Sequence, residues 1–140
     1  ARKDLSRPDQ SSFASAEASR FRHLLVREVV YGSLPKETRA RLHRRFTEWL
    51  ELRAGERVAE YEEIIGYHLE QAHRYLSELG PLDDAGVAIG ADAAHRLSNA
   101  ARRAFARGDM HAASNLLGRA IEALRIISAW SSEGTRTAFS

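Results

Sequence analysis

The amino-acid sequence predicts an all-α fold of antiparallel helical hairpins, with a short β-hairpin remnant at its N-terminal end. Three observations predict this fold class. From His23 onward, apolar residues recur at spacings of three and four, which is the period of an amphipathic helix. Glycine and proline separate the periodic segments. The 140 residues are 44% hydrophobic and 29% charged, with a formal net charge of +2, a composition typical of globular proteins.

The first long helix is predicted over residues 35–53, after a shorter helix that opens at His23. Pro35 suits a first helical turn, and Gly55 suits a helix end. Four apolar residues of this helix lie at spacings i, i+4, i+7 and i+8, opposite its arginines. We therefore predict that one stripe of the helix packs into the core. The stripe consists of Leu42, Phe46, Trp49 and Leu50.

A helix of about six turns is predicted from Val58 to Leu79, and Gly80-Pro81 ends it. His68 lies on the apolar stripe of this helix, where a hydrogen-bonded core histidine is a better interpretation than a ligand. His73 follows five residues later, so the two rings point about 140° apart on a helix. This spacing excludes the i, i+4 histidine pair of a zinc protease.

Two more helices complete the predicted array. Asp83 or Asp84 caps a helix that continues to Arg107. The small residues of its apolar stripe allow neighbouring helices to approach closely. This stripe consists of Val87, Ala91, Ala94, Leu97, Ala101 and Ala104. Gly108-Asp109 then forms the turn to the last helix. In the last helix, apolar residues occur at every position of the amphipathic pattern i, i+3, i+4, i+7, i+8 and i+11. Its stripe contains Ala113, Leu116, Leu117, Ala120, Ile121 and Leu124.

The two ends of the chain lack helical periodicity. Residues 1–22 contain a turn-like RPDQSS between short flanking pieces, which favours a β-hairpin. Residues 128–140 are expected to form an irregular tail. The predicted organisation is therefore a β-hairpin over 1–22, helical hairpins over 23–127 and a tail over 128–140.

Several kinds of chemistry are excluded by what the sequence lacks. It contains no cysteine, which removes thiolate nucleophiles and Cys-based metal sites and fits a reducing cytoplasm. Neither of its two lysines, Lys3 and Lys36, follows a glycine, so a Walker A loop is absent. No dinucleotide-binding glycine fingerprint and no GxSxG occurs. The sequence thus predicts no catalytic residue, no metal ligand and no cofactor in this chain.

Charged clusters are interpreted as solvated or interdomain faces, because none has the spacing of a metal site or the interleaved aromatics of a single-strand binder. Gly86 and Gly90 are interpreted as a close packing point between helices rather than a membrane dimer motif. The clusters are Glu60, Glu62 and Glu63; Arg41, Arg44 and Arg45; and Arg102, Arg103 and Arg107.

The stretch LSNAARRAFARGDMHAASNLLGRAIEAL, residues 97–124, resembles a tetratricopeptide repeat. Its residues match the large, small and turn positions of the pattern, although Ala104 stands where the pattern has a large aromatic residue. The resemblance implies a tetratricopeptide-like array of helical hairpins. The matching residues are Leu97, Ala101, Gly108, Asp109, Ala113, Leu117 and Ala120.

A second resemblance covers residues 1–127 and rests on FRHLLVREVVY with LH and WL downstream. This segment looks like the region that follows the P-loop ATPase domain in bacterial STAND-type signalling proteins. Those ATPases are linked to adenylate/guanylate cyclase domains or to LuxR-type DNA-binding domains. The resemblance implies that residues 1–22 end a winged-helix subdomain and that the chain belongs to a longer protein.

His23 in FRHLL resembles the histidine of the MHD-type motif of related ATPases, which reads the phosphates of bound ADP. The resemblance therefore implies a role for His23 in ADP sensing in the full-length protein. An imidazole donor at the start of a helix suits an anion. Leu24 replaces the acidic residue of the motif. The alternative is that His23 caps its helix or packs at the hairpin junction.

The function expected from these observations is a noncatalytic regulatory or protein-interaction module that couples the nucleotide state of an ATPase to an effector domain. The expected partners are the ATPase and effector domains of the same chain and a further protein, with no direct nucleic acid and no membrane. ATP or ADP would bind only in the ATPase domain. The alternatives are the regulatory segment of a cyclase, that of a LuxR-type transcription regulator, and an isolated small enzyme. A cut repeat array would expose an apolar end.

Overall fold

The computed structural model of the chain describes the backbone of residues 27–138 and the side chains of residues 27–131. Regular structure within 27–138 is entirely helical and contains no strand, which confirms the all-α prediction for these residues. The chain divides into two compact units, residues 1–34 and 35–140. The second unit contains α2 (Lys36–Ala54), the 3-10 helix η1 (Gly55–Tyr61), α3 (Glu62–Glu78), α4 (Asp84–Ala106) and α5 (Met110–Ala138).

In the first unit, residues 27–33 form a helix. The Leu34 amide donates to the Tyr31 carbonyl oxygen (3.1 Å), and the Ser33 hydroxyl donates to the carbonyl of Val30 (2.7 Å), so both groups close the helix end. The predicted helix that opens at His23 is therefore present over 27–33. Its start and the predicted β-hairpin over residues 1–22 lie outside the described residues.

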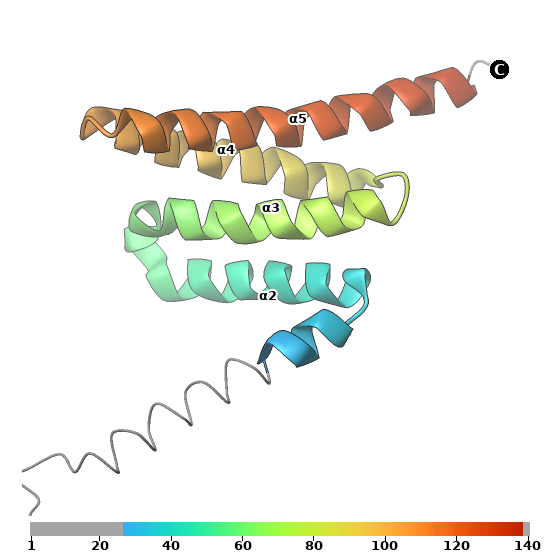
Figure 1. The fold of residues 1–140 in the computed structure, drawn as a ribbon, viewed down its shortest axis with the longest axis horizontal. Helices are drawn as coiled ribbons and strands as arrows, with labels where there is room; N and C mark the ends of the chain where they lie inside the picture. Colours follow the sequence, from blue (N-terminus) through green and yellow to red (C-terminus); the bar gives the residue numbers. More distant parts are fainter. Residues whose placement is uncertain (1–26, 139–140) are drawn as a thin grey trace, which may run out of the picture. The chain divides into compact units, whose positions relative to one another are not determined.

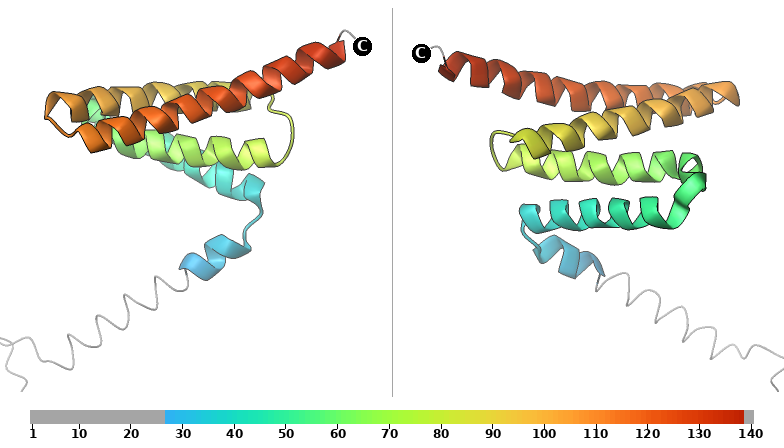
Figure 2. Two further views of the ribbon diagram at one scale, coloured as in Figure 1. Left: turned by 45° about the horizontal axis from the view of Figure 1, so that its top comes forward. Right: turned by 180° about the vertical axis from the view of Figure 1, so that it is seen from behind.

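The helices α2 to α5 lie side by side in chain order and reverse direction at each connection (Figure 1). The tilted view and the view from behind show the same neighbours, with α5 next to α4 (Figure 2). Pro35 directly precedes α2, as predicted. Gly55 follows α2 with a φ of 54°, and its amide donates to the Glu51 carbonyl. A glycine adopts this conformation without steric cost, so α2 ends where the sequence predicts.

The predicted continuous helix from Val58 to Leu79 is divided in two. Residues Gly55–Tyr61 form the 3-10 helix η1, and α3 begins only at Glu62. Neither η1 nor α3 has a side-chain N-cap. The 3-10 helix η1 forms the corner at which the chain reverses direction between α2 and α3 (Figure 1). A continuous α-helix from Val58 would not make this reversal.

An aspartate caps each of the last two helices: Asp83 caps α4 as predicted, and Asp109, predicted only as part of a turn, caps α5. The Asp83 carboxylate accepts a hydrogen bond from the Gly86 amide (2.8 Å) at the start of α4. The turn after α4 contains Gly108 with a φ of 83°. Asp109 then accepts from the Ala112 amide (3.1 Å) in the first turn of α5. Both hydrogen bonds satisfy amides that have no partner within their own helix.

Two buried clusters form the core of the second unit, and alanine is their most frequent residue. Gly90 of α4 illustrates the close packing that small residues permit. A Cβ atom added at Gly90 would lie 2.5 Å from Cε1 of His73 and 2.9 Å from Cδ1 of Ile127, which confirms this glycine as a close packing point. One cluster joins α4 and α5, and the other joins α2, α3 and α4 through Ala40, Leu50, Ile65, Leu69, Ala72, Ile89 and Ala93.

The predicted core stripe of α2 is wrong in three of its four residues. Only Leu50 is buried, whereas Leu42, Phe46 and Trp49 are exposed, with Trp49 at 54%. The buried side of α2 presents Ala40, Thr47 and Leu50 to the core instead. Small residues let α2 approach α3 closely, so the side of α2 with the bulkiest apolar residues is not the side that packs.

The last helix differs from its prediction in two respects. Ala113, Leu116 and Ala120 are buried as predicted, but the rest of the stripe, Leu117, Ile121 and Leu124, is exposed. In addition, α5 continues to Ala138, so the irregular tail predicted from residue 128 is instead helical over 128–138. This final part of α5 extends past the ends of α3 and α4 (Figure 1).

Candidate functional site

The most distinctive side-chain group in the second unit is a pair of histidines between α2 and α3. The Nδ1 atoms of His43 and His68 are 2.7 Å apart, and the two ring centroids are 5.0 Å apart. One imidazole donates this hydrogen bond, and the other accepts it. His68 is therefore a hydrogen-bonded histidine, as interpreted from the sequence, but it is half-buried and its partner is another histidine.

Aromatic rings surround the histidine pair. The Phe46 ring lies 4.5 Å from the His68 ring, and Tyr67 meets His68 edge-on at 5.0 Å. Tyr75 stacks on His43 with the centroids 6.2 Å apart. These contacts place the histidine pair at the margin between the core and the exposed apolar side chains of α2.

Burial lowers the pKa of His43 to about 4, and the charge of the neighbouring His68 adds to this effect. Burial also lowers the pKa of His68. Both lowered pKa values favour neutral imidazoles at pH 7, and two neutral rings can form this hydrogen bond with one ring as donor and the other as acceptor. Sequence reasoning missed His43, because nothing in one helix indicates which residue of the next helix will face it.

His73 occupies a different environment from His68, as their spacing predicts. It lies against Gly90 of α4 and is 1% exposed. Burial lowers the pKa of His73, and the backbone of Gly86 and Ala123 partly opposes this shift. His73 is thus a packed core residue. Within the described residues, no group of three or more histidine and acidic side chains has the arrangement of a metal site.

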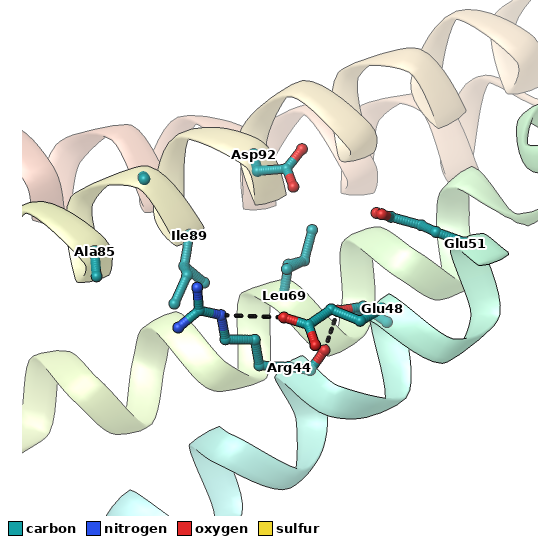
Figure 3. A pocket seen from close by; sticks show the side chains of 9 residues that line it. Arg44, Glu48, Glu51, Leu69, Ala85, Ile89 and Asp92 are labelled. Atoms are coloured by element: carbon teal, nitrogen blue, oxygen red, sulfur yellow. Dashed lines mark hydrogen bonds and ion pairs between the residues drawn. The ribbon is translucent and has the colours of Figure 1, made fainter.

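A pocket of about 230 Å³ opens between α2, α3 and α4 (Figure 3). Leu69 and Ile89 form its apolar floor, and its rim carries charged side chains. Each rim carboxylate has an arginine partner. Glu48 lies 3.7 Å from Arg44, and Glu51 and Asp92 both contact Arg96, at 3.2 and 3.5 Å.

Arg96 is the centre of the polar contacts beside this pocket. In addition to Glu51 of α2 and Asp92 of α4, it contacts Glu62 of α3 at 3.4 Å. Three helices are therefore held by one guanidinium that is 19% exposed. Glu62, interpreted from the sequence as part of a solvated acidic face, instead belongs to this interhelical network. We interpret the pocket rim as structural, because its charges already compensate one another.

The exposed side of α2 combines apolar and basic residues, and we call it the α2 outer face. Arg53 lies over the Trp49 ring, with its guanidinium carbon 5.8 Å from the ring centroid. The face contains Leu42, Phe46, Trp49 and Leu52 together with Arg41, Arg45 and Arg53, all of them exposed.

Apolar residues are also exposed on α5, and we call Leu117, Ile121 and Leu124 the α5 outer face. Two separate helices of the second unit thus present apolar rows to their surroundings. Contiguous exposed apolar residues of this kind mark interaction sites more often than isolated ones do. His23, the one residue to which the sequence assigns a cofactor role, lies outside the described residues.

Comparisons of the chain with protein-family models, curated proteins and solved structures found no match. The fold and surfaces described above therefore carry the functional argument. None of the helices within residues 27–138 has the length and apolar character needed to cross a membrane.

Proposed function

We propose that this chain is a noncatalytic regulatory and protein-interaction module of a larger bacterial signalling protein that contains an ATPase. In this proposal, α2 to α5 are tetratricopeptide-like hairpins, and residues 1–22 end a winged-helix subdomain. The α5 outer face carries the proposal, because three large apolar side chains at helical spacing stay exposed beside a buried row of the same helix. A further helix or domain that packs there would remove them from water.

The resemblance of residues 1–127 to the region after the ATPase domain of STAND-type proteins supplies the context. ATP or ADP would bind in the ATPase domain, and the helical module would pass the nucleotide state to an effector in the cytoplasm. A cyclase and a LuxR-type DNA-binding domain are the two effectors that this resemblance allows. A metal-binding aspartate pair encoded upstream would indicate the cyclase, and a helix-turn-helix encoded downstream would indicate the regulator.

The α5 outer face supplies the first test. In the parent ATPase, we expect Leu117→Glu/Ile121→Glu to change nucleotide turnover at least several-fold, because charges on this face oppose its packing against a neighbouring domain. Asn115→Glu is the control, since Asn115 is exposed on the same helix outside the apolar row. Equal turnover in all three proteins, with unchanged circular dichroism, would contradict the proposal. Hydrolysis of ATP by the purified 140-residue chain would also contradict it.

His23 supplies a second test that is specific to the nucleotide. If His23 senses ADP phosphates, His23→Ala in the parent ATPase should accelerate ADP release or raise basal activity. His111→Ala is a suitable control, because His111 is an exposed histidine of α5. An unchanged rate of ADP release would remove the sensing role and leave the interaction role of the helices untouched.

A further inference from the structure

We propose that the α2 outer face binds an acidic amphipathic segment of a partner protein. This inference deepens the proposed interaction function and rests on it, but it concerns a different surface from the α5 outer face. It states the chemistry of the partner: apolar side chains flanked by Asp or Glu carboxylates.

The apolar part of the face is a continuous row on one helix. Leu42, Phe46 and Trp49 follow one another at spacings of four and three, and Leu52 continues the row at 86% exposed. Tryptophan and arginine are the residue types that most often carry binding energy at protein interfaces. Because this row is exposed and does not pack into the core of the protein, it can bind the apolar surface of a partner.

The basic part of the face indicates the charge of the partner. At 100° per residue, the row and Arg41, Arg45 and Arg53 fall within an arc of about 140° on α2. No carboxylate lies in this arc, since the nearest acidic residue, Glu48, lies beyond Arg41 and pairs with Arg44. Among the described side chains, none of the three arginines has an ion pair. Their positive charge is thus available to a partner.

A protein partner fits this face better than a nucleic acid does. A guanidinium matches a carboxylate in a two-pronged planar arrangement, and phosphates accept it equally well. A phosphate backbone, however, offers no apolar group to Leu42 and Leu52. An amphipathic protein segment satisfies both the leucines and the arginines at once.

A lipid surface also fits less well. Basic residues of a membrane-bound helix lie beside the apolar row, where their charged ends reach the headgroups. Arg53 instead lies within the row, between the directions of Leu42 and Phe46 on the helix. Sinking this row into hydrocarbon would bury the Arg53 guanidinium, whereas a protein partner can pair it with a carboxylate.

Trp49 reports directly on binding. Trp49 and Trp130 are the two tryptophans of the chain, so Trp130→Phe leaves Trp49 as the single tryptophan, which can be excited selectively. The probe is an 18-residue amphipathic peptide built from leucine and glutamate, and its counterpart carries lysine in place of glutamate. We expect the glutamate peptide to shift Trp49 emission to shorter wavelength and the lysine peptide to leave it unchanged. Raising the salt concentration should weaken the binding of the glutamate peptide.

A charge-reversed variant provides the specificity test. Arg45→Glu/Arg53→Glu should lower the affinity for the glutamate peptide at least tenfold and should allow the lysine peptide to bind. The matched control is Arg102→Glu/Arg107→Glu, which changes an exposed arginine of α4 and the exposed arginine directly after α4, and it should leave both affinities unchanged. Circular dichroism and melting temperature establish that each variant remains folded.

Several results would overturn the proposal. The first is that the glutamate peptide does not bind. The second is that Arg102→Glu/Arg107→Glu weakens its binding as much as Arg45→Glu/Arg53→Glu does. Binding of phosphatidylserine vesicles or single-stranded DNA, with no binding of the peptide, would assign the face to another class of partner. A dimer that Arg45→Glu/Arg53→Glu dissociates would assign it to a second copy. Protection of Trp49 from acrylamide quenching in the free chain would show that the chain covers its own face. None of these outcomes decides the proposed function, because that proposal is tested separately through the α5 outer face and ATP turnover.

Discussion

Glu70 on α3 and Arg119 on α5 form a two-pronged ion pair that joins helices not consecutive in the chain. The Arg119 Nη2 atom lies 2.8 Å from Glu70 Oε1, and its Nε atom lies 3.1 Å from both carboxylate oxygens. Glu70 is 8% exposed, and removal of Arg119 would leave a carboxylate largely excluded from water. We expect Arg119→Ala to lower the free energy of unfolding by about 2 kcal/mol.

Urea denaturation with a double-mutant cycle on Glu70 and Arg119 measures this pair. The coupling energy should be about 1–2 kcal/mol, because the partner groups are hydrogen-bonded and mostly shielded from water. Glu122 and Arg125 on the exposed side of α5 form the matched control, with a distance of 2.9 Å but well-exposed side chains. Their coupling should stay below about 0.5 kcal/mol. Equal coupling in the two cycles would show that the Glu70 pair is no more than a surface contact.

Gly90 tests how closely α4 approaches its neighbours. In Gly90→Ala, the new methyl group would overlap the His73 ring and the Ile127 side chain. The loss of stability should be about 1–3 kcal/mol, the usual cost of overpacking a core. Thermal melting of the purified variant checks this value.

Gly118 is the matched control for Gly90, because it is also helical but has no neighbouring atom within 4 Å of an added Cβ. Gly118→Ala should stabilise the protein by about 0.5–1 kcal/mol through its higher helix propensity. Adding His73→Ala to Gly90→Ala should recover little, because it replaces the overlap with a cavity. A melting temperature for Gly90→Ala equal to that of Gly118→Ala would contradict the close approach.

The histidine pair makes stability depend on pH in a defined direction. The unfolded chain binds a proton at His43 below about pH 6.5, whereas folded His43 stays neutral down to its pKa of about 4. Protons therefore favour the unfolded state, and stability falls as pH decreases from about 6.5 towards 4. Because His43 is only half-buried, we expect a loss of about 1 kcal/mol between pH 7 and pH 5.

Urea unfolding of the wild type and of His43→Gln at pH 7 and pH 5 tests this dependence. His43→Gln should reduce the difference in stability between the two pH values, because glutamine does not titrate. His111→Gln controls for an exposed histidine and should retain the full difference. If stability rises on acidification in the wild type, or if His43→Gln behaves as the wild type does, folding does not lower the pKa of His43.

Local signals in the sequence predicted most helix boundaries, because the groups that end a helix are close in the chain. Pro35, Gly55, Asp83 and Gly108 all act within a turn of the residues that they cap or stop. The 3-10 corner at Gly55–Tyr61 was not predictable in this way, since the same residues also fit a helical period. The path of the chain at this corner depends on how α2 and α3 pack together.

Which face of a helix packs was less predictable than where the helix lies. Periodicity identifies an apolar row, but it does not show whether the neighbouring helix meets that row or a row of small residues beside it. In α4 the two largely coincide. Ala94, Leu97, Ala101 and Ala104 of the predicted stripe are buried, whereas Val87 is only partly buried and Ala91 is exposed. In α2 they differ, and the bulky row remains exposed. The His43–His68 pair was unpredictable for the same reason, since it depends on the register of two helices.

Trp49 separates the two interpretations of α2 most clearly. A buried tryptophan truncated to alanine would cost about 3–5 kcal/mol, whereas Trp49 is more than half exposed and contacts Phe46 at 5.8 Å between ring centroids. We therefore expect Trp49→Ala to lower the free energy of unfolding by only about 1 kcal/mol. Leu97→Ala should cost about 3–4 kcal/mol, because Leu97 is fully buried between α4 and its neighbours. Chemical denaturation of both variants measures the two losses in free energy of unfolding, which can then be compared. A cost for Trp49→Ala as large as that for Leu97→Ala would mean that the α2 outer face is covered in solution, and the face would then be core rather than a binding surface.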